Sequence, residues 1–499
     1  MAAKARWMEK LEYRVVQFSR YVSPSLLAAA LVLIITVIAL FVPPYIGMAD
    51  NGDYFRVLYS NGLYFNTPDY DSLYLGYFNK GFGIFQYFNE NGATLTSSQS
   101  LLIRLSVWIN HWFDKQVFDI RVQGALLTIL YTVAVYLFVE ALTWRMKRKY
   151  GYIVAVLAVF LFADTAYTAF FNSFFSESMV WIMLIYLFAS GLLIFRRRYS
   201  DFTMMIIFLI SGLLITTSKQ QNAPVGIIIA IMGIILIFVR RQRTFRAMVA
   251  SSLALLMFAG IATYVLIPKE FVNINKYHAM TRGVLMQSED PEATLKSFGI
   301  DRQYAVLNES IYYEPYTTVD VNSSILEDNF YKHYGFVSIL TYYISHPDQA
   351  GKMLDIAAKN AFTIRPPAMG NYEKAAGKPF GAQTKFFSGY SELKRALAPK
   401  TFGFIVIWML VITGIYTPQF IAAIKARNVR GMVRLPLMLM LMFMGLSGIL
   451  VSIIGAGDAD LSKHEFLFTA AFDLVTFTVV ADAICRNLWQ NKPAVHHES

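Results

Sequence analysis

The sequence predicts an all-α polytopic membrane protein with about ten transmembrane helices and a mostly helical domain on the outer face. Three observations carry this prediction. Of the 499 residues, 56% are apolar and only 15% are charged, whereas soluble proteins carry about 25% charged residues. Nearly uncharged stretches recur, each long enough to cross a hydrocarbon core of about 30 Å as a helix. Half of the 44 Lys and Arg lie in six segments that all fall on one side of the membrane.

The apolar segments divide the chain into two membrane modules and one intervening domain. The first segment is too long for a cleaved signal peptide and lacks a small-residue cleavage site, so we interpret it as a retained anchor. We expect a module of seven spans in 1–267, an extracytoplasmic soluble domain in 268–401 and a module of three spans in 402–499. The spans are expected near 24–46, 121–143, 151–167, 178–195, 202–218, 224–239, 247–267, 402–424, 435–455 and 466–485.

The basic residues predict the orientation of the spans. If the N-terminus is cytoplasmic, the basic segments 1–22, 144–150, 196–201, 240–246, 425–434 and 486–499 are all cytoplasmic, as the positive-inside rule requires. Both termini are therefore expected inside. The net charge of +11 then reflects membrane orientation and not nucleic-acid binding. The single cysteine, Cys485, excludes an internal disulfide and a thiolate metal cluster.

The remaining segments fall on the outer side. They are the long first loop 47–120, the turns 168–177, 219–223 and 456–465, and the domain 268–401. In the first loop, apolar residues at helical spacing predict a helix over 97–113 that lies in the membrane interface; they are Leu101, Leu102, Leu105, Trp108, Ile109 and Trp112. In the domain, 329–345 and 347–362 predict two helices separated at His346-Pro347, and the Gly/Pro-rich stretch 365–385 predicts a loop.

Polar residues of both signs gather at the outer ends of the spans, where the turns are otherwise aromatic and apolar. They are Asp50 and Asp53 in "MADNGDYFR" (48–56), Glu177, Lys219, Gln220, Gln221, Asp458, Lys463 and His464. Each has a simpler explanation as a helix cap, a charge that complements a helix dipole, or an interfacial anchor. Their density on one side nevertheless favours a cavity for a polar, partly anionic substrate at the membrane surface.

The chain resembles the GT-C superfamily of integral-membrane glycosyltransferases over nearly its whole length. Within that superfamily it looks most similar to bacterial hexosyltransferases of cell-wall and surface-layer glycan synthesis (WsfD-like). The resemblance rests on the topology and on "MADNGDYFR", "FNSFFSES" (171–178), "KYHAMTRGVL" (276–285), "FGIDRQYAVLN" (298–308) and "GDADLSKHEFLF" (457–468). It implies a GT-C fold in the bacterial plasma membrane, with an extracytoplasmic active site. The "DNGD" sequence departs from the adjacent acidic pair of some relatives.

The resemblance also implies the substrates and the residue roles. The donor would be a polyprenyl-phosphate sugar, and the acceptor a cell-envelope glycan or lipid-linked glycan, with inversion at the sugar carbon. Such transfer needs a base for the acceptor hydroxyl and cations for the leaving phosphate. We expect Asp50 as base. Asp53 is the second choice, or else positions the acceptor or binds a metal, and Glu177 orients the acceptor or joins an acid pair. The expected substrate-binding residues are Lys219, Lys463 and His464 at the phosphate, with Arg56, Arg282 and Arg365 as further cations and Gln220, Gln221 and Asp458 as polar contacts.

Two other classes of function fit the composition. A transporter or flippase of lipid-linked glycans would place charges at mid-membrane and break its spans in symmetry-related pairs, whereas interior charges here are few, chiefly Asp473, and no inverted repeat is visible. A non-catalytic assembly protein is the other alternative. "DNGD" offers oxygen ligands for a divalent cation, but two acids fall short of a full coordination set, so we expect no obligatory metal or other cofactor.

Overall fold

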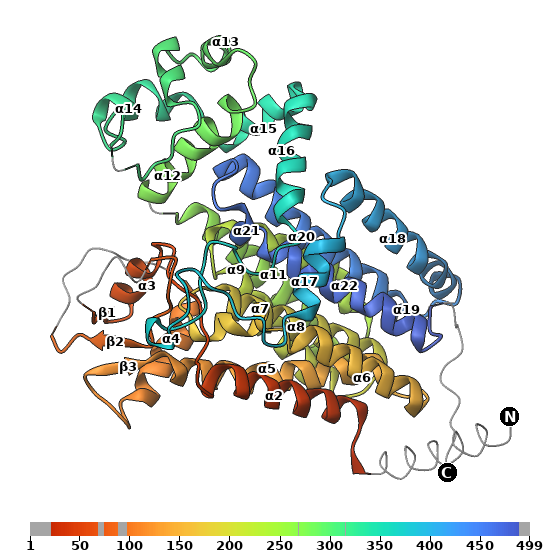
Figure 1. Ribbon diagram of the computed structural model, residues 1–499. Helices are drawn as coiled ribbons and strands as arrows, with labels where there is room; N and C mark the ends of the chain where they lie inside the picture. Colours follow the sequence, from red (N-terminus) through yellow and green to blue (C-terminus); the bar gives the residue numbers. More distant parts are fainter. Residues whose placement is uncertain (1–20, 68–73, 88–96, 268, 315, 489–499) are drawn as a thin grey trace, which may run out of the picture.

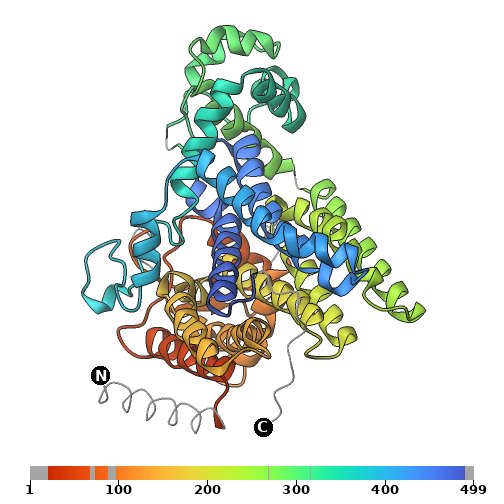
Figure 2. The same ribbon diagram turned by 90° about the vertical axis from the view of Figure 1, so that its right-hand side faces the viewer.

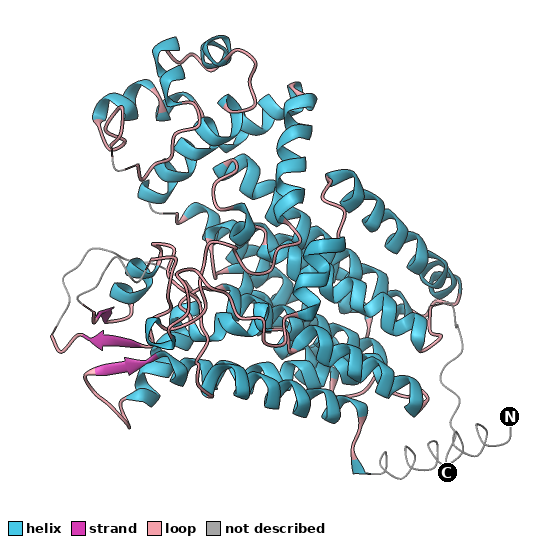
Figure 3. Ribbon diagram, viewed as in Figure 1, coloured by secondary structure: helices cyan, strands magenta, loops and turns pink. Residues whose placement is uncertain are grey.

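The computed structural model describes residues 21–67, 74–87, 97–267, 269–314 and 316–488. The described chain is a bundle of long helices from which a smaller helical region projects (Figures 1 and 2). Figure 3 shows that strands are confined to one edge of the molecule. The predicted fold class, a polytopic all-α membrane protein, is confirmed. Residues 1–20 and 489–499 of the predicted cytoplasmic termini lie outside the described residues.

Every predicted span contains a helix. Within the described residues, eight helical segments are long and apolar enough to cross a membrane, and a ninth counts if α6 and the following α7 and η2, bent by 48°, form one span. The tenth, α9, has 16 residues and is about 24 Å long, shorter than a typical hydrocarbon core. The helices are α2 (Pro24–Phe41), α5 (Ile120–Thr143), α6 (Arg148–Phe162), α7 (Thr165–Thr168), η2 (Ala169–Asn172), α8 (Glu177–Arg196), α9 (Asp201–Thr216), α10 (Ala223–Met232), η4 (Gly233–Phe238), α11 (Arg243–Val265), α18 (Phe402–Lys425), α19 (Val429–Met432), α20 (Arg434–Ala456) and α22 (Phe466–Ile484).

Two spans end earlier than predicted, each for a local reason. The first ends at Phe41 and not near 46, because proline at 43 disfavours the helical conformation of Val42, which is extended. The third ends at Phe162 and not near 167. There Asp164 turns the chain by accepting a hydrogen bond from the backbone N–H of Ala166 at 2.8 Å, which caps α7.

Helix α8 lies at the centre of the bundle and contacts α5, α9, α20 and α22. Its Trp181 stacks on Tyr167 of α7 with ring centroids 4.1 Å apart. The interior also holds more charge than the sequence analysis expected: Arg434 pairs with Asp482, and Lys394 Nζ lies 2.7 Å from Asp473 Oδ1. A buried charge is stable only when it is paired, so these residues hold helices together.

The first loop, 47–120, which is predicted to lie outside, contains two short helices and a small sheet. The antiparallel strands β1 (Leu63–Phe65), β2 (Gly81–Ile84) and β3 (Val117–Asp119) form the order β1-β2-β3, which the sequence analysis did not predict. Helices α3 (Tyr54–Ser60) and α4 (Gln99–Asn110) complete the loop. On α4 and just beyond it, Leu101, Leu105, Trp108 and Trp112 are exposed along one face, as an interfacial helix requires.

The projecting region contains α12 (Lys269–Ala279), the π-helix η5 (Met280–Leu285), α13 (Pro291–Ser297), η6 (Arg302–Leu307), α14 (Ser324–Asn329), η7 (Tyr331–His333), α15 (Phe336–Ser345) and α16 (Pro347–Asn360). The helix predicted to begin at 329 begins at Phe336, because Gly335 is extended and ends the preceding turn. The break before Pro347 is as predicted.

The Gly/Pro-rich stretch 365–385 is mostly loop, as predicted, with the short η8 (Lys374–Ala376), and α17 (Gly389–Leu397) follows it. In Figure 1 this segment crosses the bundle between α4 and α17. It is tied to the end of the first span, because Asn371 Nδ2 donates to Gly47 O at 2.8 Å and Ala49 N donates to Gly370 O at 3.0 Å. The last part of the predicted domain 268–401 therefore packs on the membrane helices.

Candidate functional site

Four segments that are distant in sequence meet at one end of the bundle. They are residues 50–53, which follow the first span, Glu177 at the start of α8, residues 219–221, which follow α9, and residues 460–464, which include the short helix α21 (Leu461–His464) between α20 and α22. We call Asp50, Asn51, Asp53, Glu177, Lys219, Gln221, Asp460, Lys463 and His464 the outer cluster, after the side of the membrane on which the sequence predicts them. Seven sequence-predicted residues fall within it.

Lys463 is the central cation of the outer cluster. Its buried ammonium pairs with the Asp53 carboxylate and lies 3.4 Å from Asn51 Oδ1 and 4.0 Å from Asp460 Oδ2. Burial alone would lower the pKa of Lys463, but the carboxylates of Asp53 and Asp460 raise it above its ordinary value. Lys463 is therefore charged at any physiological pH.

Asp53 is the exposed partner of this pair, with half of its side-chain surface accessible. Desolvation would raise its pKa, but the charge and hydrogen bond of Lys463 outweigh that effect and lower the pKa to about 2. An acid held so firmly ionised is a weak proton acceptor, so Asp53 suits an electrostatic role better than that of a base.

Asp50 has the opposite environment. It is only 3% exposed, and its Oδ1 accepts hydrogen bonds from the backbone N–H groups of Gly52 at 2.8 Å and Tyr54 at 3.1 Å. Desolvation outweighs these bonds and raises its pKa from 3.8 to about 6. Within the described chain, its Oδ2 is buried without a hydrogen-bond partner. The carboxylate thus combines a fixed orientation, a pKa near neutrality and one free oxygen.

Glu177 and Lys219 form a second ion pair beside the first. Glu177 is 2% exposed at the start of α8, and one of its oxygens, Oε1, accepts from the Lys219 ammonium. The other, Oε2, has no partner among the described residues. Lys219 lies close enough to help lower the pKa of Asp53, so the two cations act on one electrostatic site.

The imidazole of His464 is held by Gln221 in η3 (Gln220–Asn222). Gln221 Nε2 donates to Ser452 Oγ at 2.6 Å and to His464 O at 2.6 Å, so its Oε1 faces His464 Nδ1 at 2.9 Å as an acceptor. Nδ1 therefore carries the proton and Nε2 presents a lone pair. Desolvation, with Lys219 and Lys463 nearby, lowers the pKa of His464 to about 3. The sequence analysis expected His464 at the phosphate; this environment instead favours a neutral imidazole ring.

Arg282 and Asp458 bind each other. Arg282 Nε and Nη2 each lie 2.7 Å from an Asp458 oxygen, and Nη1 donates to Glu309 O at 2.9 Å. Gly457 permits this clamp, because it has φ +61° and a Cβ there would lie 2.6 Å from the Arg282 carbonyl carbon. The pair predicted to contact substrate thus joins η5 to the turn before α21.

The other residues predicted to bind substrate lie outside the outer cluster. Arg56 on α3 donates to Tyr313 Oη at 2.7 Å and so reaches the projecting region. Gln220 is partly exposed in η3. Arg365 is buried in a different place, where it donates to Gln383 Oε1 at 3.1 Å and Thr384 O at 3.2 Å. It stabilises the 365–385 loop and does not join the outer cluster.

Three residues of this region, Asn51, Asp460 and Glu465, were assigned no catalytic or binding role from the sequence. Asn51 Nδ2 donates to Asp460 Oδ2 at 3.0 Å and so joins the first loop to α21. Glu465 is fully buried, with neither carboxylate oxygen hydrogen-bonded among the described residues, and its pKa is raised by desolvation. All three stand in the two quoted motifs, "DNGD" and "GDADLSKHEF", which was the available signal.

In the described part of the chain, no group of three His, Cys, Asp or Glu residues could hold a metal ion. Three of the four acids of the outer cluster are paired with lysines, Asp53 and Asp460 with Lys463 and Glu177 with Lys219. The outer cluster therefore offers one proton acceptor, Asp50, and two cations, Lys463 and Lys219.

The model of the family described as YfdI N-terminal transmembrane domain matches residues 8–498 of the chain. The match covers all ten predicted spans and every residue of the outer cluster. It does not single out surface-layer hexosyltransferases. No curated protein and no solved structure matches the chain.

Proposed function

The chain belongs to the YfdI N-terminal transmembrane domain family, whose members are glycosyltransferase-like membrane proteins, and we propose that it transfers a hexose. The donor is a polyprenyl-phosphate-linked sugar, and the acceptor is a cell-envelope glycan or a lipid-linked glycan. The reaction takes place at the outer cluster, on the extracytoplasmic face of a bacterial plasma membrane. The single observation that carries this proposal is the free Oδ2 of buried Asp50 in the same cluster as two ion-paired lysines, Lys463 and Lys219.

In the proposed reaction, the acceptor hydroxyl oxygen bonds to C1 of the hexose while the bond from C1 to the phosphate oxygen breaks. Asp50 Oδ2 takes the hydroxyl proton, and the electron pair of the broken bond leaves with the polyprenyl phosphate. With a pKa near 6, Asp50 is mostly ionised at neutral pH and still basic enough to accept a proton. Attack opposite the leaving group inverts the sugar carbon, as the resemblance to GT-C enzymes implies.

The two lysines stabilise the charge that develops on the leaving phosphate. Each is already oriented by a carboxylate, Lys463 by Asp53 and Lys219 by Glu177. Prior orientation by neighbouring groups means that little reorganisation is needed when the phosphate arrives. Asp53 is half exposed, so it can move into solvent while the phosphate replaces it as the counter-charge of buried Lys463.

The neutral His464 and the second oxygen of Glu177 fit the acceptor better than the donor. His464 Nε2 presents only a lone pair, which repels phosphate but accepts a hydrogen bond from a sugar hydroxyl. Glu177 Oε2 is likewise a free acceptor. Both would orient hydroxyl groups near Asp50.

The test uses purified protein in proteoliposomes with a polyprenyl-phosphate hexose labelled in the sugar, and a glycan acceptor. A transferase moves the label covalently to the acceptor and releases unlabelled polyprenyl phosphate. A flippase would change only the leaflet in which intact donor is found. Movement of intact donor without any labelled product would contradict the proposal.

A further inference from the structure

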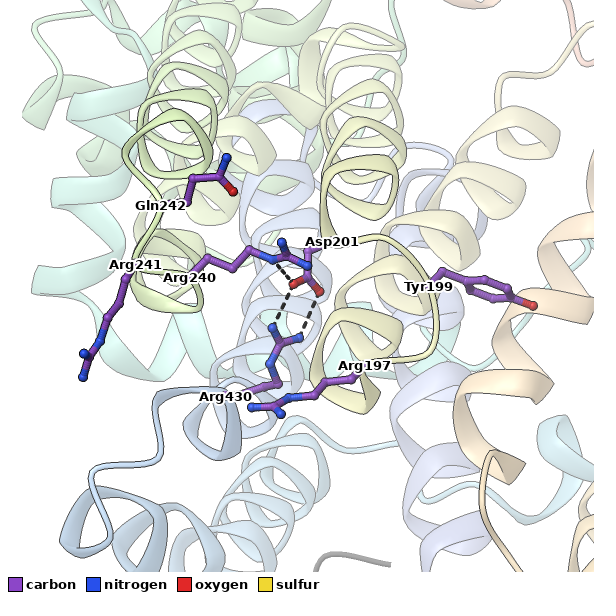
Figure 4. Close-up of a pocket in the computed structure, with 7 residues that line it drawn as sticks. All are labelled: Arg197, Tyr199, Asp201, Arg240, Arg241, Gln242 and Arg430. Carbon is purple, nitrogen blue, oxygen red and sulfur yellow. Dashed lines mark hydrogen bonds and ion pairs between the residues drawn. The ribbon is translucent and has the colours of Figure 1, made fainter.

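A second charged site lies at the opposite end of the bundle from the outer cluster. Helix α8 runs from Glu177 in the outer cluster to Arg196, and α9 returns from Asp201 towards Lys219. Between these far ends, the described residues line an open pocket of about 430 Å³. Its lining residues, drawn in Figure 4, are Arg197, Tyr199, Asp201, Arg240, Arg241, Gln242 and Arg430.

Arginine outnumbers acid four to one in this pocket, which we call the arginine pocket. The single acid, Asp201, is 3% exposed and is bound by both Arg240 and Arg430 (Figure 4). Arg430 Nη1 and Nη2 reach its two oxygens at 2.9 Å and 2.8 Å. Asp201 thus holds Arg240 and Arg430 in place, and we call these three residues the floor of the pocket. One carboxylate cannot neutralise the charge of four arginines.

The other two arginines remain available. Arg197 and Arg241 are exposed, and their side chains make no hydrogen bond or ion pair within the described chain. The neighbours of Arg197 are engaged elsewhere: Arg196 Nε donates to Ala141 O at 3.1 Å, and Arg198 Nε donates to Glu140 Oε1 at 2.7 Å. The basic motif 196–198 thus directs one cation into the pocket.

Two further features add positive potential. Helices α9 and α11, of 16 and 23 residues, both begin at the pocket, and the N-terminus of a helix carries partial positive charge. Arg430 Nε is buried and lacks a hydrogen-bond partner among the described residues. A buried donor without a partner is costly unless an acceptor completes it.

We propose that the arginine pocket binds a phosphate-bearing anion, a diphosphate or a phosphodiester, through Arg197, Arg241 and the floor arginine Arg430. Guanidinium forks match phosphate oxygens in geometry, and a surplus of three positive charges needs a counter-charge. The phosphate comes from a free molecule on the basic-loop side of the membrane or from an anionic lipid headgroup, since the pocket lies where the apolar helices end.

The experiment compares two charge-matched double variants of the full-length protein. Arg197→Gln/Arg241→Gln removes the available arginines but leaves the three residues of the floor, so the fold should persist. Lys425→Gln/Arg427→Gln removes two exposed cations outside the pocket. Binding of radiolabelled pyrophosphate is measured in detergent. Thermal unfolding is measured in vesicles of phosphatidylcholine alone or mixed in equal parts with phosphatidylglycerol.

For a free phosphate ligand, the pocket variant should bind pyrophosphate about tenfold or more weakly than the control variant, because it lacks two guanidinium groups that donate charge-assisted hydrogen bonds. For a lipid headgroup, phosphatidylglycerol should raise the melting temperature of the wild type and of the control variant but not that of the pocket variant. Either result supports the proposal. It is overturned if the two variants behave alike in both measurements, or if the wild type responds in neither.

Discussion

Replacing Asp50 by asparagine should separate activity from stability. Asparagine has the same shape, and its Oδ1 can still accept the backbone N–H groups of Gly52 and Tyr54. What it loses is the ability to take a proton. General-base catalysis contributes about 10²- to 10⁴-fold, so transfer should fall by at least two orders of magnitude.

Asp50→Asn should not lower the free energy of unfolding, although it lowers activity. Because burial raises the pKa of Asp50, its contribution to stability is greatest below the unfolded value of 3.8 and is lost as the pH rises through about 6. The difference between these two pKa values corresponds to about 3 kcal/mol of destabilisation at pH 7, which Asp50→Asn removes. An amide N–H₂ without a partner costs about 1–3 kcal/mol, so the net change should be neutral or stabilising.

The assay is steady-state transfer from labelled donor, together with thermal unfolding of the same preparation. Asp290→Asn is the matched control, since Asp290 also accepts a backbone N–H, that of Ala293 at 3.0 Å, but lies outside the outer cluster. It should keep activity. The reasoning is refuted if Asp50→Asn keeps wild-type activity, or if its activity falls only in proportion to lost folded protein.

Three further predictions follow from the same contacts. The value of kcat/KM should rise with pH through about 6 and then level off, because Asp50 must be ionised to accept a proton; a rate that is flat from pH 5 to pH 8 would exclude it as the base. Lys463→Gln and Lys219→Gln should each weaken use of the donor by roughly 10- to 150-fold, measured with the donor varied, and unchanged donor kinetics in both would place the phosphate elsewhere. In a protein lacking Cys485, a cysteine in place of the exposed Tyr316 should be labelled only from outside and one in place of the exposed Arg241 only from inside; the reverse pattern would invert the topology.

The membrane helices were predictable because their signal is local. A span of 17–24 apolar residues needs no knowledge of its neighbours, and each of the ten predicted segments contains a helix. The predicted ends of the first and third spans were wrong. The first helix ends because a proline follows Val42, and the third ends where Asp164 caps the next helix. The sheet was missed because its strands have only three or four residues, too few to show alternation.

The outer cluster was predictable as a location but not as a set of pairs. Polar residues at the outer ends of several spans must share one membrane surface, which is why Asp50 and Lys463 could be named together from the sequence. The partner of each charge depends on how segments about 410 residues apart meet, as Asp53 and Lys463 do. Arg365 was misplaced for that reason, because nothing in its neighbourhood reports that it faces Gln383.

The most direct test of the central claim is a single-turnover reaction of wild-type protein and Asp50→Asn with the same labelled polyprenyl-phosphate hexose and acceptor. Mass spectrometry identifies the products. If the outer cluster is the transferase site, the wild type yields a glycosylated acceptor and free polyprenyl phosphate, and the variant yields at least 100-fold less of both, as loss of a general base requires. Intact donor after incubation with folded wild type, or equal product from the two proteins, would contradict the account.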